Sequence, residues 1–173
     1  VTDNTRIRAA VPTIKYILSQ GGSCVLLSHL GRPKGIEHKY SLKHIVKEVE
    51  NVLDKKIIFF NDCVGDKAEN ISSNLKPGQV LLLENLRFYP EETSGDDKFS
   101  RKLSRHGSVY VNDAFGTAHR AHASTAIMAK YFLEKSSGKL LEKEVSAVRN
   151  VTNSTKKPVL AIIGGAKVSS KIT

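Results

Sequence analysis

At 173 residues, the chain has room for one ordinary domain and a short additional segment. Its apolar fraction of 40% and charged fraction of 25% exclude a disordered tail, and its longest apolar run, Val159 to Ile163, is too short to cross a membrane. The net charge of +10 makes an anionic partner worth considering, although surplus lysine by default indicates only a solvated surface. The two cysteines have neither metal-ligand spacing nor a disulfide framework.

Short apolar runs alternate with helical patterns along the chain. In chain order the sequence predicts a helix over 5–19, a strand over 24–28, a helix over 41–53, a strand over 57–60, a helix over 64–75 and a strand over 80–83. There follow a helix from the acidic stretch 91–97 to about 106, a strand over 109–111, helical turns within 124–132, a linker at 136–138, a helix over 139–152 and a strand over 159–163. Thr2 or Asp3 is expected to cap the first helix and Ser41 the second, while Pro12 should kink the first helix or begin a second segment of it.

Strands that are apolar throughout and separated by helices are typical of a parallel sheet covered on both faces. We therefore expect an α/β fold with a doubly wound parallel sheet and helices on both faces, a Rossmann-like three-layer α/β/α arrangement. Ligands bind such sheets at the carboxyl ends of the strands. That edge is consequently the place to look for chemistry.

Arginines and histidines follow three of the predicted strands. His29, Gly31 and Arg32 follow the first strand, Glu84, Asn85 and Arg87 the third, and Asn112, Asp113, Gly116, Thr117, His119, Arg120 and His122 the fourth. Arg6 stands at the start of the first helix, which brings it to the same rim. Arginine suits the bidentate recognition of phosphate or carboxylate, and glycine lets backbone amides approach a ligand. The pattern predicts a binding site for a small anion.

Other kinds of site fit the pattern less well. His119 and His122 lack a carboxylate or cysteine at ligand spacing, so we expect no metal site. No strand end carries a nucleophile with a His or Asp relay, and no Gly-x-Gly-x-x-Gly follows the first strand. The segment Gly164-Gly165-Ala166-Lys167 lacks P-loop spacing, yet it places glycines and a lysine where a phosphate could lie, with Lys171 one helical turn later.

Several segments resemble phosphoglycerate kinase, and they occur in that family's order. They are Thr5-Arg6-Ile7, Ser28-His29-Leu30-Gly31-Arg32-Pro33, Leu83-Glu84-Asn85-Leu86-Arg87-Phe88, the twelve residues from Val111 to His122, and Gly164-Gly165-Ala166-Lys167-Val168. The resemblance implies phosphoryl transfer between 1,3-bisphosphoglycerate and ADP, giving 3-phosphoglycerate and ATP in glycolysis, with Mg²⁺ on the nucleotide. It implies that Arg6 reaches the transferring phosphoryl group, that Arg6 and Lys167 are catalytic, and that the nucleotide is bound by Gly164, Gly165, Ala166, Lys167 and Lys171. The substrate-binding set is Arg6, His29, Leu30, Gly31, Arg32, Arg87, His119 and Arg120.

The resemblance also implies a division into domains. Residues 1–138 are expected to form the phosphoglycerate-binding amino-terminal domain without its first strand, 139–155 the interdomain helix, and 156–173 the start of a truncated nucleotide-binding domain. The chain is thus expected to be an inactive fragment of a monomeric, cytoplasmic enzyme with neither nucleic-acid nor membrane partners. Two alternatives remain open: a non-catalytic α/β domain that binds a small phosphorylated acid and, third in order, a nucleic-acid-binding protein.

Overall fold

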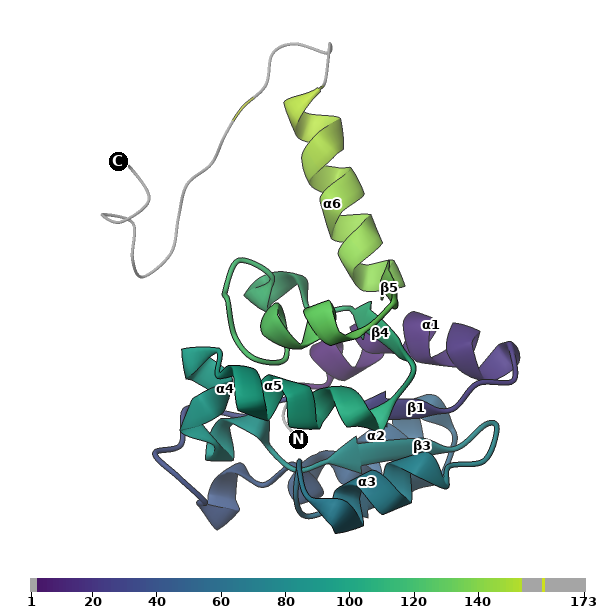
Figure 1. The fold of residues 1–173 in the computed structure, drawn as a ribbon. Coiled ribbons are helices and arrows are strands. Elements are labelled where there is room, and N and C mark those ends of the chain that lie inside the picture. The colour runs from purple at the N-terminus through teal and green to yellow at the C-terminus, as the bar shows by residue number, and fades with distance from the viewer. Residues whose placement is uncertain (1–2, 154–159, 161–173) are drawn as a thin grey trace.

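A computed structural model describes residues 3–153 and residue 160 of the chain (Figure 1). The α-helices are α1 (Thr5–Ser19), α2 (Val46–Leu53), α3 (Asp66–Ser73), α4 (Pro90–Ser94), α5 (Asp97–Leu103) and α6 (Lys139–Thr152). The strands are β1 (Cys24–Leu26), β2 (Ile57–Phe60), β3 (Val80–Leu83), β4 (Val109–Asn112) and β5 (Glu134–Ser137), and short 3₁₀ turns connect several of these elements. No helix among the described residues is long and apolar enough to cross a membrane.

The prediction that Thr2 or Asp3 caps the first helix is wrong, whereas the Ser41 cap is confirmed for the turn that precedes α2. The N-cap of α1 is Asn4, which makes no side-chain cap hydrogen bond, although the adjacent Asp3 Oδ1 accepts a hydrogen bond from the backbone N–H of Thr5 at 2.8 Å. Ser41 Oγ accepts one from Lys43 N at 3.1 Å, although the first turn after it is 3₁₀ rather than α-helical. Pro12 lies inside α1, which continues past it as one helix, so the expected second segment does not exist.

Strand β3 is the centre of the main sheet, whose order is β1-β3-β2 with both pairings parallel. All four residues of β3 are buried, and alternate side chains enter two separate cores. Leu81 and Leu83 pack with Phe99 and Leu103 of α5, whereas Val80 and Leu82 pack with residues of α1 and α2. This two-sided burial confirms the predicted α/β fold with parallel strands and helices on both faces.

Two details of the predicted architecture are wrong. The strands form two sheets, because β4 pairs only with β5 and no ladder joins this pair to β1, β2 or β3 within the described residues. Residues 136–138 were expected to be a linker, but 136 and 137 belong to β5, a fully exposed strand that is held by its backbone pairing to β4. The serine-rich composition of an exposed edge strand resembles that of a linker, because only its backbone takes part in the fold. The predicted strand 159–163 lies outside the described residues, except for Leu160.

The carboxylate of Asp113 joins the end of β4 to two helices. Its Oδ2 accepts a hydrogen bond from Thr13 Oγ1 of α1 at 2.6 Å, and its Oδ1 accepts two from the Leu140 and Leu141 amides of α6, at 2.9 and 3.0 Å. The N–H of Lys139 in turn donates to Thr13 Oγ1 at 2.9 Å. A Cβ at Gly138 would lie 2.2 Å from Asp113, so glycine is required where the chain enters α6.

Candidate anion-binding site

The loop after β1 carries four of the predicted site residues and makes one very tight turn. Gly31 has φ +64, and a Cβ there would lie 2.5 Å from the ring of Tyr40. Only glycine satisfies both the left-handed backbone and this close approach. The carbonyl of Gly31 accepts a hydrogen bond from Arg87 Nη1 at 2.7 Å. The turn therefore connects the loop that bears Arg32 to the arginine that follows β3.

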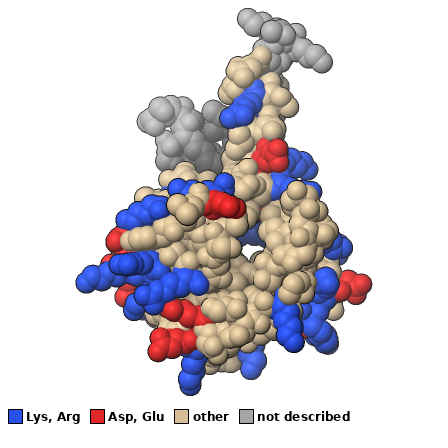
Figure 2. All heavy atoms as spheres, turned by 45° about the vertical axis from the view of Figure 1, so that its right-hand side comes forward, with Lys and Arg blue, Asp and Glu red and all other residues tan. Residues whose placement is uncertain are grey.

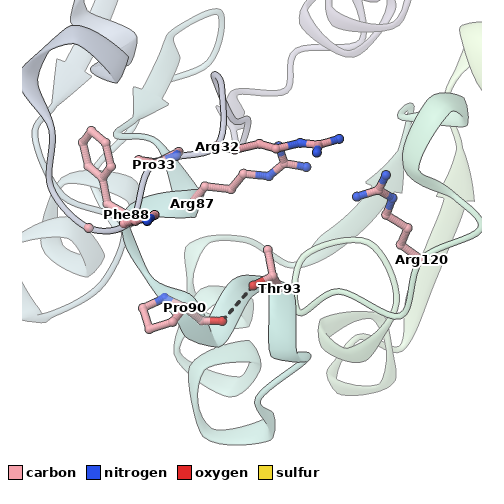
Figure 3. A pocket seen from close by; sticks show the side chains of 9 residues that line it. Arg32, Pro33, Arg87, Phe88, Pro90, Thr93 and Arg120 are labelled. Atoms are coloured by element: carbon pink, nitrogen blue, oxygen red, sulfur yellow. Dashed lines mark hydrogen bonds between the residues drawn. The ribbon is translucent and has the colours of Figure 1, made fainter. Parts of the chain in front are cut away.

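Three of the predicted arginines, Arg32, Arg87 and Arg120, line one pocket of about 370 Å³. In Figure 3 the side chains of Arg32 and Arg87 lie side by side, and Arg120 faces them from the opposite wall. Arg32 comes from the loop after β1, Arg87 from the 3₁₀ turn after β3, and Arg120 from the long loop after β4. We predicted that these three arginines would lie together because each follows a strand, and the pocket that they share is consistent with that prediction.

Arg87 is the most constrained of the three arginines. Burial, then the positive charges of Arg120 and Arg32, lower its pKa. Its Nε is buried and has no hydrogen-bond partner among the described residues. An unsatisfied buried donor on a cation costs free energy, and an anion in the pocket would remove that cost.

The other predicted residues in the described part of the chain do not line this pocket. Burial, together with the positive charges of Arg87, His122, Arg6 and Arg120, lowers the pKa of His29 to about 4, so these groups lie near His29. His29 is therefore neutral near pH 7, and its ring can donate or accept a hydrogen bond. His119 Nε2 accepts a hydrogen bond from Arg120 Nε at 3.3 Å. Gly164, Gly165, Ala166, Lys167 and Lys171 lie outside the described residues.

One buried carboxylate, Glu92, supports the loop after β4. Only 3% exposed, it accepts hydrogen bonds from Ser124 N at 3.0 Å and Ser124 Oγ at 2.6 Å. His122 Nδ1 lies 3.9 Å from Glu92 Oε1, but burial and the positive charges of Arg120 and Arg87 lower the pKa of His122 despite this carboxylate. Glu92 thus orders the chain next to Arg120, and its two oxygens are already occupied by Ser124.

Sequence reasoning missed several residues that line the pocket, among them Lys34 and Thr93. Lys34 follows Arg32 in the same loop, so its position next to an anion site could have been anticipated. Thr93 belongs to α4, and its Oγ1 donates to the carbonyl of Pro90 at 3.2 Å. A search of strand ends could not find it, because α4 is brought to the pocket by the turn at 86–88.

The charged side chains on one face, and the described residues of the types that bind metals, give no sign of a basic stripe or a metal cluster there. On the face seen in Figure 2, Lys and Arg form several separate groups with acidic side chains between some of them, rather than one continuous stripe. Within residues 3–153, no group of three His, Cys, Asp or Glu side chains is arranged to hold a metal ion. The three-arginine pocket is therefore the feature that best indicates a ligand.

Comparison with known proteins decides the family. The family model "Phosphoglycerate kinase" matches residues 1–173. The chain belongs to the phosphoglycerate kinase family. It is 51% identical over 172 residues to phosphoglycerate kinase 3, cytosolic, of Arabidopsis thaliana, and 52% identical over 174 residues to phosphoglycerate kinase of Moorella thermoacetica.

Solved structures of the phosphoglycerate kinase family share the fold. The crystal structure of the enzyme from Pyrococcus horikoshii OT3 matches 98% of this chain with a TM-score of 0.89 and 32% identity, and that from Coxiella burnetii matches 99% with a TM-score of 0.84 and 36% identity. The match covers 99% of this chain and 43% of the Arabidopsis protein, and 100% of this chain and 44% of the Moorella protein. This chain likewise spans 43% of each solved chain, so it corresponds to less than half the length of these relatives.

Proposed function

We propose that the protein transfers a phosphoryl group between 1,3-bisphosphoglycerate and ADP, giving 3-phosphoglycerate and ATP, and that the described residues bind the phosphoglycerate. Membership of the phosphoglycerate kinase family supports the reaction. The single observation that carries the role of this chain is the pocket in which Arg32, Arg87 and Arg120 converge and in which Arg87 Nε has no partner among residues 3–153. Phosphoryl transfer depends mainly on positioning and on positive charge, and such a pocket provides both.

The site residues divide by role in this proposal. Arg32, Arg87 and Arg120 hold the phosphate or carboxylate of the acid, and neutral His29 adds a hydrogen bond at their edge. Leu30, Gly31 and His119 lie within two residues of Arg32 or Arg120 in the chain and complete the substrate-binding set. Arg6, whose positive charge lowers the pKa of His29, meets the phosphoryl group during transfer.

The rest of the protein completes the reaction. We assign the phosphates of the nucleotide, which enters as its Mg²⁺ complex, to Gly164, Gly165, Ala166, Lys167 and Lys171, with Lys167 catalytic. Residues 1–138 then form the acid-binding domain, 139–155 the interdomain helix and 156–173 the start of the nucleotide domain. We further propose a cytosolic monomer without nucleic-acid or membrane partners; relatives include proteins named cytosolic and one named chloroplastic.

The test separates an enzyme from a binding domain through Arg6. In the full natural protein, Arg6→Ala should lower kcat at least about a hundredfold and change KM for 3-phosphoglycerate only severalfold, the pattern of lost transition-state stabilisation. Arg6→Lys should also be poor, because an ammonium lacks the bidentate fork. Arg8→Ala, on the same exposed start of α1, is the matched control and should leave both constants unchanged. A sharp rise in KM with kcat maintained would make Arg6 a ground-state ligand, and a wild-type protein without turnover would favour the binding domain.

A further inference from the structure

Asn85 is a fully buried polar residue directly between the two loops that carry Arg32 and Arg87. It follows β3 and has 0% exposure. Its Nδ2 donates to the carbonyls of Leu30 at 2.8 Å and Tyr40 at 2.9 Å, and its Oδ1 accepts from the backbone N–H of Arg87 at 3.0 Å. One side chain therefore contacts both ends of the loop after β1 and the backbone of the arginine across from it.

The hydrogen-bonding pattern at this position is one that asparagine alone supplies at this length. Two carbonyls require two donors, and the Arg87 amide requires an acceptor, which together use both N–H groups and the oxygen of one amide. Aspartate would present an acceptor to two carbonyl oxygens, and serine could donate to only one of them. Because buried backbone groups that lose their partners are costly, the loops cannot keep this arrangement without Asn85.

The neighbouring contacts extend this arrangement to the pocket. The carbonyl held by Asn85 belongs to Leu30, and the next carbonyl, that of Gly31, accepts the bond from Arg87 Nη1. At the other end of the loop, buried Glu84 accepts from Ser41 Oγ at 2.6 Å and from Leu42 N at 2.7 Å. Asn85 and Glu84 therefore hold the loop that carries Arg32, and that loop in turn accepts a hydrogen bond from the guanidinium of Arg87.

We propose that Asn85 is a positioning residue of the anion pocket: it sets the distance between Arg32 and Arg87 before a ligand arrives. The identity of the ligand rests on the proposed function, but the positioning does not. Preorganised donors bind an anion without first paying for their own ordering, so losing Asn85 should lower affinity even though it touches no ligand.

The experiment compares Asn85→Ala and Asn85→Ser with Leu103→Ala in the full natural protein. Leu103 is a buried core residue of α5 that neither lines the pocket nor takes part in the Asn85 hydrogen bonds, so its truncation costs stability without removing any of those bonds. Calorimetry should show 3-phosphoglycerate binding weakened about 10–100-fold by Asn85→Ala, the range expected if a misplaced Arg87 loses one charge-assisted hydrogen bond to the ligand. Asn85→Ser, which keeps one polar group, should be intermediate, and Leu103→Ala should stay within about twofold because it leaves the pocket intact.

A double mutant shows whether the effect passes through Arg87. In an Arg87→Ala background, the additional loss from Asn85→Ala should be several times smaller than in the wild type, since residues that act as a unit are not additive. Equal losses in both backgrounds, or equal affinities in the Asn85 and Leu103 variants, would overturn the proposal. If Asn85→Ala does not fold, Asn85→Ser and Leu103→Ala make the same comparison.

Hydrogen exchange without ligand separates this proposal from the proposed function. The Arg87 amide donates to Asn85 Oδ1, so it should exchange at least about tenfold faster in the Asn85 variants than in Leu103→Ala. If wild-type protein fails to bind 3-phosphoglycerate but this exchange difference is present, the proposed function is wrong and the positioning holds. Unchanged exchange at the Arg87 amide refutes the positioning, whatever the ligand.

Discussion

Replacing Asp113 by alanine should separate α6 from the body of the domain. The carboxylate accepts one hydrogen bond from Thr13 on α1 and two from the first-turn amides of α6, so one substitution removes all three of these hydrogen bonds. Loss of a helix N-cap costs about 1 kcal/mol, and loss of a hydrogen bond to a charged acceptor costs about 1.5–3 kcal/mol. Thr13 is itself buried, so its hydroxyl does not recover a partner from bulk water.

Together these losses predict a decrease of about 2–4 kcal/mol in the free energy of unfolding for Asp113→Ala. The assay is urea denaturation followed by circular dichroism, with hydrogen exchange at the Leu140 and Leu141 amides as a local measure. Asp113→Asn, which keeps an acceptor for those amides, should lose less. Asp97→Ala removes an exposed carboxylate that pairs with Lys130 and accepts a hydrogen bond from Tyr131, and it should lower the free energy of unfolding far less than Asp113→Ala, so it serves as the control. A loss below about 1 kcal/mol for Asp113→Ala, with unchanged exchange at both amides, would refute the bridging role derived from the structure.

Two further predictions concern the loop after β1. The pKa of His29 is lowered from 6.5 to about 4, so the wild-type protein should lose stability as pH falls from about 6.5 toward 4, and His29→Gln should flatten that part of the curve. Because the ring is partly exposed, this pH-dependent loss of unfolding free energy is limited to roughly 1–2 kcal/mol, which denaturation at several pH values can measure. Parallel stability curves for the wild type and His29→Gln would contradict the prediction. Gly31→Ala should cost about 2–3 kcal/mol, because the left-handed backbone and the Tyr40 ring both oppose a Cβ, whereas Gly116→Ala, with open space around it, is the control. Equal unfolding free energies for the two glycine variants would show that the loop readily moves away from the ring.

The sequence was sufficient to predict the parallel α/β fold and three residues of the pocket, for identifiable physical reasons. Strand β3 is apolar at every position because it is covered on both faces, and that continuous pattern indicates a central parallel strand. In a parallel sheet the residues after β1 and β3 meet at one edge, whereas Arg120 follows β4 of the second sheet, so the single predicted sheet does not account for its place. Arg32, Arg87 and Arg120 do line one pocket.

Other features were not predictable because they depend on contacts that composition does not reveal. Strand β5 is exposed at all four positions, so its side chains carry no apolar pattern and only its backbone pairing identifies it. Thr93 reaches the pocket through the packing of α4, which no local motif specifies. Asn85 was recognised as a strand-end residue, but its two donated hydrogen bonds join positions 45 and 55 residues away in the chain and become visible only in three dimensions.

The most direct test of the acid-binding role is calorimetric titration of 3-phosphoglycerate into the full natural protein and its Arg32→Ala and Arg87→Ala variants. Arg105→Ala, which removes a solvent-exposed guanidinium paired with Glu69, is the matched control. Each pocket variant should bind about 1.5–3 kcal/mol more weakly, the contribution of a charge-assisted hydrogen bond, while the control keeps wild-type affinity. Wild-type affinity in both pocket variants would contradict the assignment and place the acid on another edge of the sheet.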